Sequence, residues 1–232
     1  MELSVVVPTL NESANIVALL ERLRHTPGVG EVVVADGGST DGTPELVRQP
    51  TRLVRARSGR GFQLNAGARE TSGEVLLFLH ADVVPPPDVA VQIKGAVAAG
   101  CVGGNFRLSY PEGGLLGRWL EVLTPFYRAL GRYYGDSGIF VRRDVYERVE
   151  GFPEIPVMED VVFVRKLEGA GKTAYLPGLM MSSPRRWERG SLRTLLLWGF
   201  MQTAFALGVS PWRLADFYRV HGAGRTGKKI PP

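Results

Sequence analysis

Three short polar segments of this 232-residue sequence each follow directly after an apolar run, and their side chains could bind a metal ion or a phosphate. The segments are PTLNE at 8–12, DGGSTDGT at 36–43 and HAD at 80–82. Hard cations such as Mg²⁺ and Mn²⁺ take oxygen ligands, and Mg²⁺ often combines one or two carboxylates with substrate phosphates. Asp82 could therefore hold a cation against a diphosphate. The alternative is an aspartate in the turn before the prolines at 85–87.

A fourth segment, MEDV at 158–161, holds two adjacent acids, Glu159 and Asp160. Acids are favoured in the first turn of a helix, because the helix N-terminus carries partial positive charge. A carboxylate also suits a general base, which must lie within hydrogen-bond reach of an acceptor hydroxyl. Glu159 and Asp160 are therefore candidates for either role.

The order of elements along the chain predicts a sheet that positions the first three segments. Strands alternate with helices, and the strands are continuous apolar runs, which is typical of an α/β fold with a parallel sheet covered by helices on both faces. Such sheets bind ligands at the carboxyl ends of their strands, so the polar segments are expected to converge on one edge. The expected strands are 3–7, 31–35, 53–56 and 74–79, and the expected helices are 11–24, 40–47 and 62–70.

After residue 87 the pattern predicts an extension of the sheet and then a helical segment. We expect three parts: a Rossmann-like domain at 1–187, an apolar C-terminal helical segment at 188–221 and a disordered basic tail at 222–232. The expected elements are helix 89–99, strand 103–110, helix 115–134, strand 135–141, helix 159–167 and helix 191–207.

Composition narrows the class of partner. The net charge of +5 and the pI near 9.5 favour anionic partners such as nucleotides, sugar phosphates or lipid headgroups. Nucleic acid is not expected, because zinc-finger spacing and an RNA-binding aromatic signature are both missing. The single cysteine, Cys101, excludes an intramolecular disulfide and a cysteine-based zinc site. The N-terminal residues look like a first strand and not a signal peptide, so we expect a cytoplasmic protein.

Taken together, the segments resemble a family 2 glycosyltransferase over roughly residues 1 to 187. The ordered set is PTLNE (8–12), DGGSTDGT (36–43), SGRGFQLNAGA (58–68), HAD (80–82), GDSGIFVRRDVYERVEGF (135–152) and ED (159–160). The resemblance implies a GT-A fold, a nucleotide-diphosphate sugar donor, a divalent cation (Mg²⁺ or Mn²⁺) and inversion at the anomeric carbon.

The resemblance also implies roles for single residues. Asp160 looks like the catalytic base, with Glu159 beside it, and Asp82 looks like the last acid of the D-x-D motif and so the metal ligand. Asp36 looks like the contact to the nucleotide base, and Arg60 looks like a second nucleotide contact. The implied nucleotide site as a whole is Pro8, Thr9, Glu12, Asp36, Arg60 and Asp82.

Two positions depart from the family's pattern. His80 replaces the first acid of D-x-D; histidine can ligate Mn²⁺ but is a poorer partner for Mg²⁺, which leaves the identity of the metal open. SPRRW at 183–187 keeps the Arg-Trp of the Q-x-x-R-W signature of processive members but lacks its glutamine, which argues against polysaccharide synthesis. Arg186 and Trp187 stay candidates for a diphosphate or acceptor contact; a helix-flanking basic residue is the alternative.

The apolar stretch 191–209 is borderline for a spanning helix, which needs about 20 predominantly apolar residues. We expect it to pack on the domain, to form a homodimer contact or to lie in a membrane interface. The amphipathic helix at 115–134, with arginines on its flank, could join it around a lipid-linked or apolar acceptor at the inner face of the membrane. Plain core packing is the alternative.

Other classes of protein fit less well. An NAD-dependent oxidoreductase would need a G-x-G-x-x-G fingerprint, which does not follow the first strand. A nucleotidyltransferase shares the alternating strands and the metal-binding acid, but it would normally carry a basic, glycine-rich loop where PTLNE stands. A catalytically silent nucleotide-sugar-binding protein is supported by His80 and opposed by the intact Asp82 and Asp160.

Overall fold

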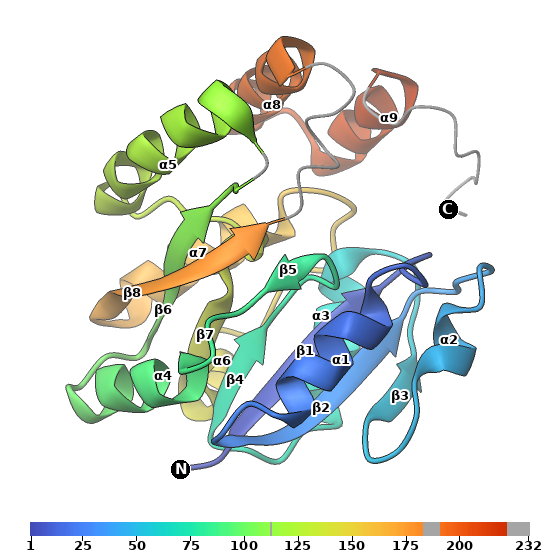
Figure 1. Cartoon of the computed structure of the whole chain (residues 1–232). Helices are drawn as coiled ribbons and strands as arrows, with labels where there is room; N and C mark the ends of the chain where they lie inside the picture. The colour runs from blue at the N-terminus through green and yellow to red at the C-terminus, as the bar shows by residue number, and fades with distance from the viewer. Residues whose placement is uncertain (112, 183–190, 222–232) are drawn as a thin grey trace.

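The computed structural model describes residues 1–111, 113–182 and 191–221. In this part of the chain, eight strands form one sheet in the order β3-β2-β1-β4-β7-β6-β8-β5 (Figure 1). The strands are β1 (Leu3–Thr9), β2 (Val29–Asp36), β3 (Arg52–Arg55), β4 (Val75–Phe78), β5 (Val83–Val84), β6 (Gly103–Ser109), β7 (Ile139–Arg142) and β8 (Thr173–Ser182). The helices are α1 (Ile16–Arg24), α2 (Thr43–Leu46), α3 (Arg60–Arg69), α4 (Val89–Ala98), α5 (Gly114–Ala129), α6 (Arg143–Arg148), α7 (Glu159–Ala170), α8 (Ser191–Ala206) and α9 (Pro211–His221), with a 3-10 turn η1 at Gly135–Ser137.

The first four strands of the sheet are parallel, as the sequence predicted. β1 pairs in parallel with β2 and β4, and β2 pairs in parallel with β3. β7 runs antiparallel to both β4 and β6, while β6 and β8 are parallel. The register places Thr9 beside Asp36, so the segments that follow β1 and β2 lie together at the carboxyl edge.

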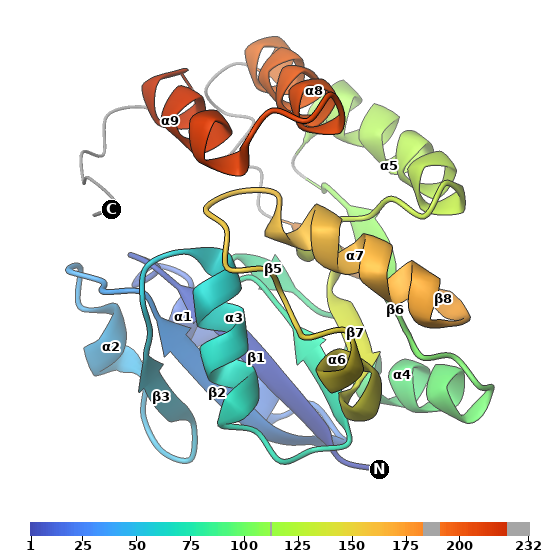
Figure 2. The ribbon, with the colours of Figure 1, turned by 180° about the vertical axis from the view of Figure 1, so that it is seen from behind.

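Helices cover both faces of the sheet, because successive side chains of a strand point to opposite faces. Val5 and Val7 pack with α1 and α4 in one core, and Val6 packs with α3, α6 and α7 in another. Figure 2 shows α3, α6 and α7 on the face opposite α1. The predicted α/β architecture with helices on both faces is therefore confirmed.

The predicted helix 115–134 is too long. Helix α5 ends at Ala129, because Gly131 adopts a left-handed conformation with φ of 67°. The Arg132 N–H donates to the Tyr127 carbonyl and the Gly131 N–H to the Arg128 carbonyl, which is the Schellman arrangement that closes a helix.

Other boundaries also differ from the expectations. The predicted strand 135–141 begins with η1 and becomes a strand only at Ile139, and the predicted helix 40–47 is a single turn, α2. The predictions missed β5, β8 and α6, and they covered α9 only as part of the helical segment 188–221. The apolar segment 188–221 contains α8 and α9 in its described part, and the predicted tail 222–232 lies outside the described residues. Within the described ranges, none of the helices combines the length and apolar character required to cross a bilayer.

Candidate active site

Asp160 lies in the first turn of α7, where two backbone N–H groups hold its carboxylate. Its Oδ1 accepts a hydrogen bond from the Val161 N–H at 2.8 Å, and its Oδ2 accepts one from the Gly135 N–H at 3.1 Å. Met158 precedes the helix in a left-handed conformation with φ of 67°, which turns the chain into α7. The carboxylate is therefore oriented by both its own helix and the turn that precedes β7.

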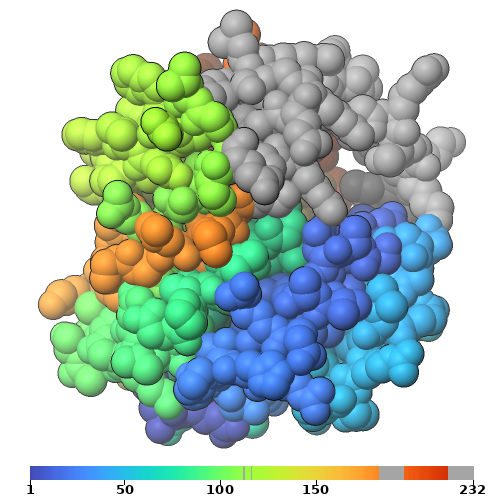
Figure 3. All heavy atoms as spheres, viewed as in Figure 1, coloured from blue at the N-terminus to red at the C-terminus, as the bar shows by residue number. Residues whose placement is uncertain are grey.

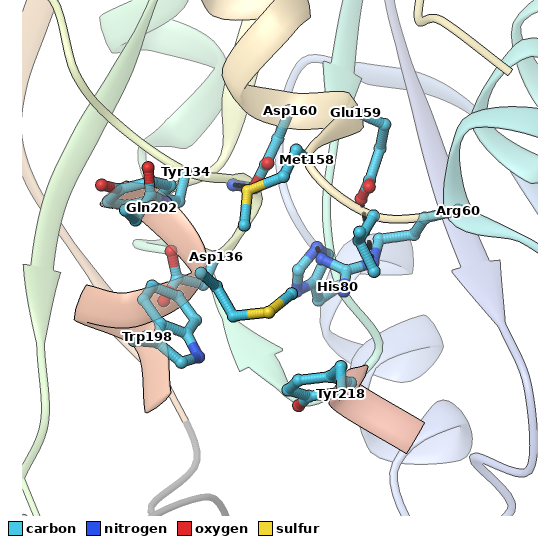
Figure 4. A pocket seen from close by; sticks show the side chains of 13 residues that line it. Arg60, His80, Tyr134, Asp136, Met158, Glu159, Asp160, Trp198, Gln202 and Tyr218 are labelled. Carbon is cyan, nitrogen blue, oxygen red and sulfur yellow. Dashed lines mark hydrogen bonds and ion pairs between the residues drawn. The ribbon is translucent and has the colours of Figure 1, made fainter. Parts of the chain in front are cut away.

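Arg60, the first residue of α3, connects Glu159 to His80. Its Nε lies 3.2 Å from the Glu159 Oε1, and the Glu159 side chain is buried. Its Nη1 lies 3.4 Å from the His80 Nε2; since a guanidinium can only donate, this ring nitrogen is the acceptor. Figure 4 shows Arg60 extending toward both partners. The negative charge of Glu159, followed by that of Asp160, raises the pKa of Arg60 above its ordinary value.

Two glycines permit this close packing. A Cβ at Gly135 would lie 2.7 Å from the His80 Nε2, and a Cβ at Gly61 would collide with the Pro153 carbonyl oxygen. The first glycine brings the turn that binds Asp160 against His80. The second lets the N-terminus of α3, which carries Arg60, approach the loop before α7.

These groups share a cavity of about 150 Å³. Four of the predicted site residues line it: Arg60, His80, Glu159 and Asp160. The remaining lining residues are Tyr134, Gly135, Asp136, Val157, Met158, Trp198, Met201, Gln202 and Tyr218. The cavity thus joins two predicted catalytic acids, a cation and a histidine.

The sequence did not predict the wall that α8 and α9 supply. Trp198 and Gln202 come from α8, and Tyr218 comes from α9 (Figure 4). Tyr134 packs edge-on against Trp198 with 5.4 Å between ring centroids. Burial, with a contribution from the charge of Asp160, raises the pKa of Tyr134 to about 12, so its hydroxyl is protonated at neutral pH. Gln202 was the available signal, since it is a polar residue in an otherwise apolar run.

Asp36 shapes the loop that follows β2. Its Oδ2 accepts from the backbone N–H groups of Gly38 and Ser39, and its Oδ1 accepts from the hydroxyls of Thr9 and Ser39. An ionised carboxylate has about four acceptor positions, and these donors use them. The side chain is buried, at 2 % exposure. The predicted contact of Asp36 with a nucleotide base would therefore require one of these donors to be replaced.

The segments 8–12 and 36–43 are joined by hydrogen bonds. The Glu12 N–H donates to the Thr43 hydroxyl at 2.9 Å, and the Asn11 N–H donates to the Ser39 hydroxyl at 2.8 Å. Gln63 of α3 donates to the Thr9 carbonyl at 2.7 Å. Pro8, Thr9, Glu12, Asp36 and Asp82 are not among the described residues that line the 150 Å³ cavity. The structure thus places four of the predicted site residues in the lining of one cavity and the others in loops outside that lining.

The predicted metal ligands fit a divalent cation only in part. No three His, Cys, Asp or Glu side chains gather into a metal site within the described ranges. The half-buried Asp82 offers one carboxylate in the turn after β4, which suits a cation that takes its other ligands from phosphates. The His80 Nε2 faces the Arg60 guanidinium, an arrangement that repels a second cation. Asp82 therefore fits the implied role, and His80 does not fit it in this arrangement. Arg186 and Trp187 lie outside the described residues.

Comparison with known families identifies the class. Residues 4–144, more than half of the chain, match the family model for glycosyl transferase family 2. The chain therefore belongs to glycosyltransferase family 2, as the ordered motifs predicted.

Individual relatives give the same class. Glycosyltransferase AglE of Haloferax volcanii is 28 % identical over 187 residues, which cover 72 % of this chain and 62 % of the relative. The dolichol-phosphate mannosyltransferase of Pyrococcus furiosus is 30 % identical over 168 residues, which cover 66 % of this chain and 45 % of the relative. The chain thus spans about half the length of these curated relatives.

Solved structures share the fold. The mannosyltransferase from Pyrobaculum calidifontis in complex with GDP-Man and Mn²⁺ superposes with a TM-score of 0.65 at 24 % identity. The match covers 93 % of this chain and 69 % of that structure. The predicted GT-A fold is therefore confirmed.

Proposed function

We propose that this protein transfers a glycosyl group from a nucleotide-diphosphate sugar to an acceptor hydroxyl, with inversion and with Asp160 as the base. The observation that carries the proposal is the carboxylate of Asp160, fixed by two N–H donors in the wall of a cavity that also contains Arg60. A base of this kind removes the acceptor's proton when the hydroxyl lies within hydrogen-bond reach. The new oxygen–carbon bond then forms on the face opposite the leaving diphosphate.

Arg60 is proposed to stabilise the leaving diphosphate. Negative charge grows on that group as the glycosidic bond breaks, and a fixed cation placed there lowers the barrier. Glu159 is proposed as a positioning residue, because its buried carboxylate holds the Arg60 Nε at 3.2 Å. Arg60 stays protonated at every pH at which the protein is folded.

Asp82 is proposed to hold the divalent cation. The relative from Pyrobaculum calidifontis was solved with Mn²⁺, and its fold is the one seen here. A bound Mg²⁺ or Mn²⁺ would neutralise part of the charge of the donor's two phosphates. His80 is proposed to contact the donor and not the metal, because its Nε2 already faces Arg60.

The acceptor is proposed to be a hydroxyl group on a lipid-linked molecule. The name of the Pyrococcus furiosus relative, a dolichol-phosphate mannosyltransferase, supports a lipid-linked substrate. The apolar wall of the cavity, which includes Val157, Trp198 and Met201, suits an acceptor with a hydrocarbon chain near its reacting end.

The proposal is tested by thermal unfolding with UDP, GDP, CDP, ADP and dTDP, each with and without Mn²⁺ or Mg²⁺. A ligand present at one hundred times its dissociation constant stabilises a protein by about 2.7 kcal/mol. We expect one nucleotide to raise the melting temperature, and the metal to increase that shift. Absence of any shift would overturn the donor site and favour a protein that does not bind nucleotide sugars.

A further inference from the structure

The side of α5 that faces the body of the protein carries two bound charged residues, and Leu120 packs against the core beside them. The Glu121 carboxylate accepts hydrogen bonds from the Ser109 hydroxyl at 2.9 Å and from the Tyr110 N–H at 2.6 Å. Arg128 lies 3.2 Å from the Glu168 carboxylate and donates to the Thr173 hydroxyl at 2.7 Å. Both charged residues at the inner side are therefore bound by the sheet and by α7.

The opposite side of α5 is an apolar stripe that faces solvent. Leu115, Trp119, Val122, Phe126 and Leu130 follow one another at intervals of three or four residues, so they lie on one side of the helix. They are 80 %, 66 %, 60 %, 67 % and 70 % exposed, respectively. An ordinary surface helix packs its apolar side inward, and soluble monomers seldom expose a continuous apolar patch. The stripe, defined by these five residues, therefore requires a partner.

Two further helices add apolar residues at the same end of the molecule. Figures 1 and 2 both show α5, α8 and α9 together at the end opposite the N-terminus. Figure 3 shows α5 in green on the surface at that end. The large apolar residues exposed on α8 and α9 and between them are Leu196, Phe200, Leu207, Val209 and Trp212.

The charges beside the stripe favour an anionic lipid surface. The exposed side chain of Arg118 on α5 is cationic, whereas the acid of α5, Glu121, is bound inward; α9 adds the exposed Arg213 together with the exposed acid Asp216. Trp119 and Phe126 are of the type that anchors helices at the boundary between headgroups and acyl chains. An amphipathic helix with an arginine flank and an aromatic apolar side is typical of helices that lie in that boundary.

The position of the stripe connects it to the candidate active site. Tyr134, a few residues after α5, lines the cavity, as do Trp198 of α8 and Tyr218 of α9. The three helices that would meet a bilayer thus supply or adjoin the cavity wall. A lipid chain held in the bilayer could extend its polar end toward Asp160 without leaving the membrane.

We propose that the α5 stripe is a docking surface for an anionic lipid bilayer, with α5 lying in the plane of the interface. The role of this surface in presenting a lipid-linked acceptor rests on the proposed function, but binding to the bilayer does not.

The test is co-sedimentation with vesicles of phosphatidylcholine, with and without phosphatidylglycerol, without donor or acceptor. We expect the protein to bind vesicles that contain phosphatidylglycerol, and we expect added salt to weaken this binding. Vesicles of phosphatidylcholine alone should bind the protein more weakly. The variant Trp119→Glu/Phe126→Glu should bind the anionic vesicles about tenfold or more weakly, because it places charges in the acyl boundary. The matched control is Val91→Glu on α4, whose side chain is 64 % exposed away from the stripe, and it should bind like the wild type.

Three results would overturn the proposal. The first is that the wild-type protein binds neither kind of vesicle, and the second is that the double variant binds the anionic vesicles as well as the wild type does. The third is that light scattering shows a dimer that the double variant converts to a monomer, because the stripe would then be a dimer contact. Thermal unfolding with nucleotide on the same samples separates the two proposals. Vesicle binding without nucleotide binding would overturn the function alone, and the reverse result would overturn the docking surface alone.

Discussion

Helices α1 and α5 are both amphipathic, yet they turn opposite sides to the sheet. In α1 the apolar residues Ile16, Leu19 and Leu23 are buried against β1 and β2, and the charged residues face water. In α5 the charged Glu121 and Arg128 are bound inward and the apolar stripe is exposed. An amphipathic helix therefore has two distinct sides, and in α5 the polar partners on β6, β8 and α7 bind the charged side.

The same contrast extends to the two regions that contain these helices. The region built from β1 to β4 satisfies its polar loops internally, as the bonds between segments 8–12 and 36–43 show. The layer of α5, α8 and α9 exposes large apolar side chains, and α8 and α9 supply one wall of the cavity. The polar groups of the first region thus have partners within that region. The second region has an apolar surface that a binding partner would cover.

Leucine-to-alanine substitutions in α1 and α5 give the largest expected difference between the buried apolar side of α1 and the exposed apolar side of α5. Leu23→Ala in α1 removes a side chain that is 1 % exposed, and we expect a loss of about 2–5 kcal/mol in the free energy of unfolding. Leu115→Ala removes a side chain that is 80 % exposed, and we expect a change within about 0.5 kcal/mol. Urea denaturation measures both. Equal losses would show that the α5 stripe is packed in solution.

The ion pair between Arg60 and Glu159 tests how the two regions are coupled, since α3 belongs to the first and α7 lies beside the second. Arg60→Ala leaves the Glu159 carboxylate buried without its cation. We expect a loss of about 1–3 kcal/mol, less than for a fully buried pair, because the Arg60 side chain is 41 % exposed. Adding Glu159→Gln to Arg60→Ala should recover part of that loss in urea denaturation. Strict additivity of the two changes would show that the pair contributes nothing.

The pH dependence of stability tests the hydrogen bonds that the Asp41 carboxylate accepts within the first region. The Thr43 hydroxyl, together with the Thr43 and Ser13 N–H groups, holds the pKa of Asp41 well below its ordinary value of 3.8. Since the folded-state pKa is the lower one, this stabilisation is present above about pH 4 and is lost as the pH falls through the folded-state pKa.

Asp41→Asn should therefore melt at a slightly lower temperature than the wild type at pH 7. The difference should narrow as the pH is lowered below 3.8. Asp144→Asn, at an exposed ion pair with Arg142, is the control for general acid effects. A difference that stays constant down to low pH would contradict the role assigned to the Asp41 carboxylate.

Much of the fold could be predicted because local sequence determines it. The apolar runs at 3–7, 31–35 and 74–79 have the length and the apolar composition of buried parallel strands, and turn residues bound them. Strand β8 was missed because Pro177 and Gly178 interrupt its pattern; the structure accommodates them with a shift of register opposite Phe106 and Arg107. Such a shift depends on the neighbouring strand and leaves no local signal.

In the candidate site, too, some residues could be predicted from local sequence, whereas others depend on how distant elements pack. Arg60, His80, Glu159 and Asp160 lie in segments whose residue types already indicated chemistry, and the fold brings them into one cavity. Trp198, Gln202 and Tyr218 were missed as cavity residues because their place depends on how α8 and α9 pack across the edge of the sheet. The Arg60–His80 contact was also missed, and it is the basis for proposing that His80 contacts the donor.

The most direct test of the account compares transfer and binding in Asp160→Asn, with Asp144→Asn as the control. The asparagine keeps the size of the side chain, and its one oxygen can still accept from either the Val161 or the Gly135 N–H, but it cannot take a proton from an acceptor. With the donor found by thermal unfolding and a polyprenyl-diphosphate-linked sugar in vesicles as the acceptor that carries the hydroxyl, we expect release of nucleoside diphosphate to slow by about 10²–10⁴-fold. Stabilisation by the nucleotide should stay unchanged. Unimpaired turnover, or an equal loss of turnover and nucleotide binding, would contradict the role of Asp160 as the base.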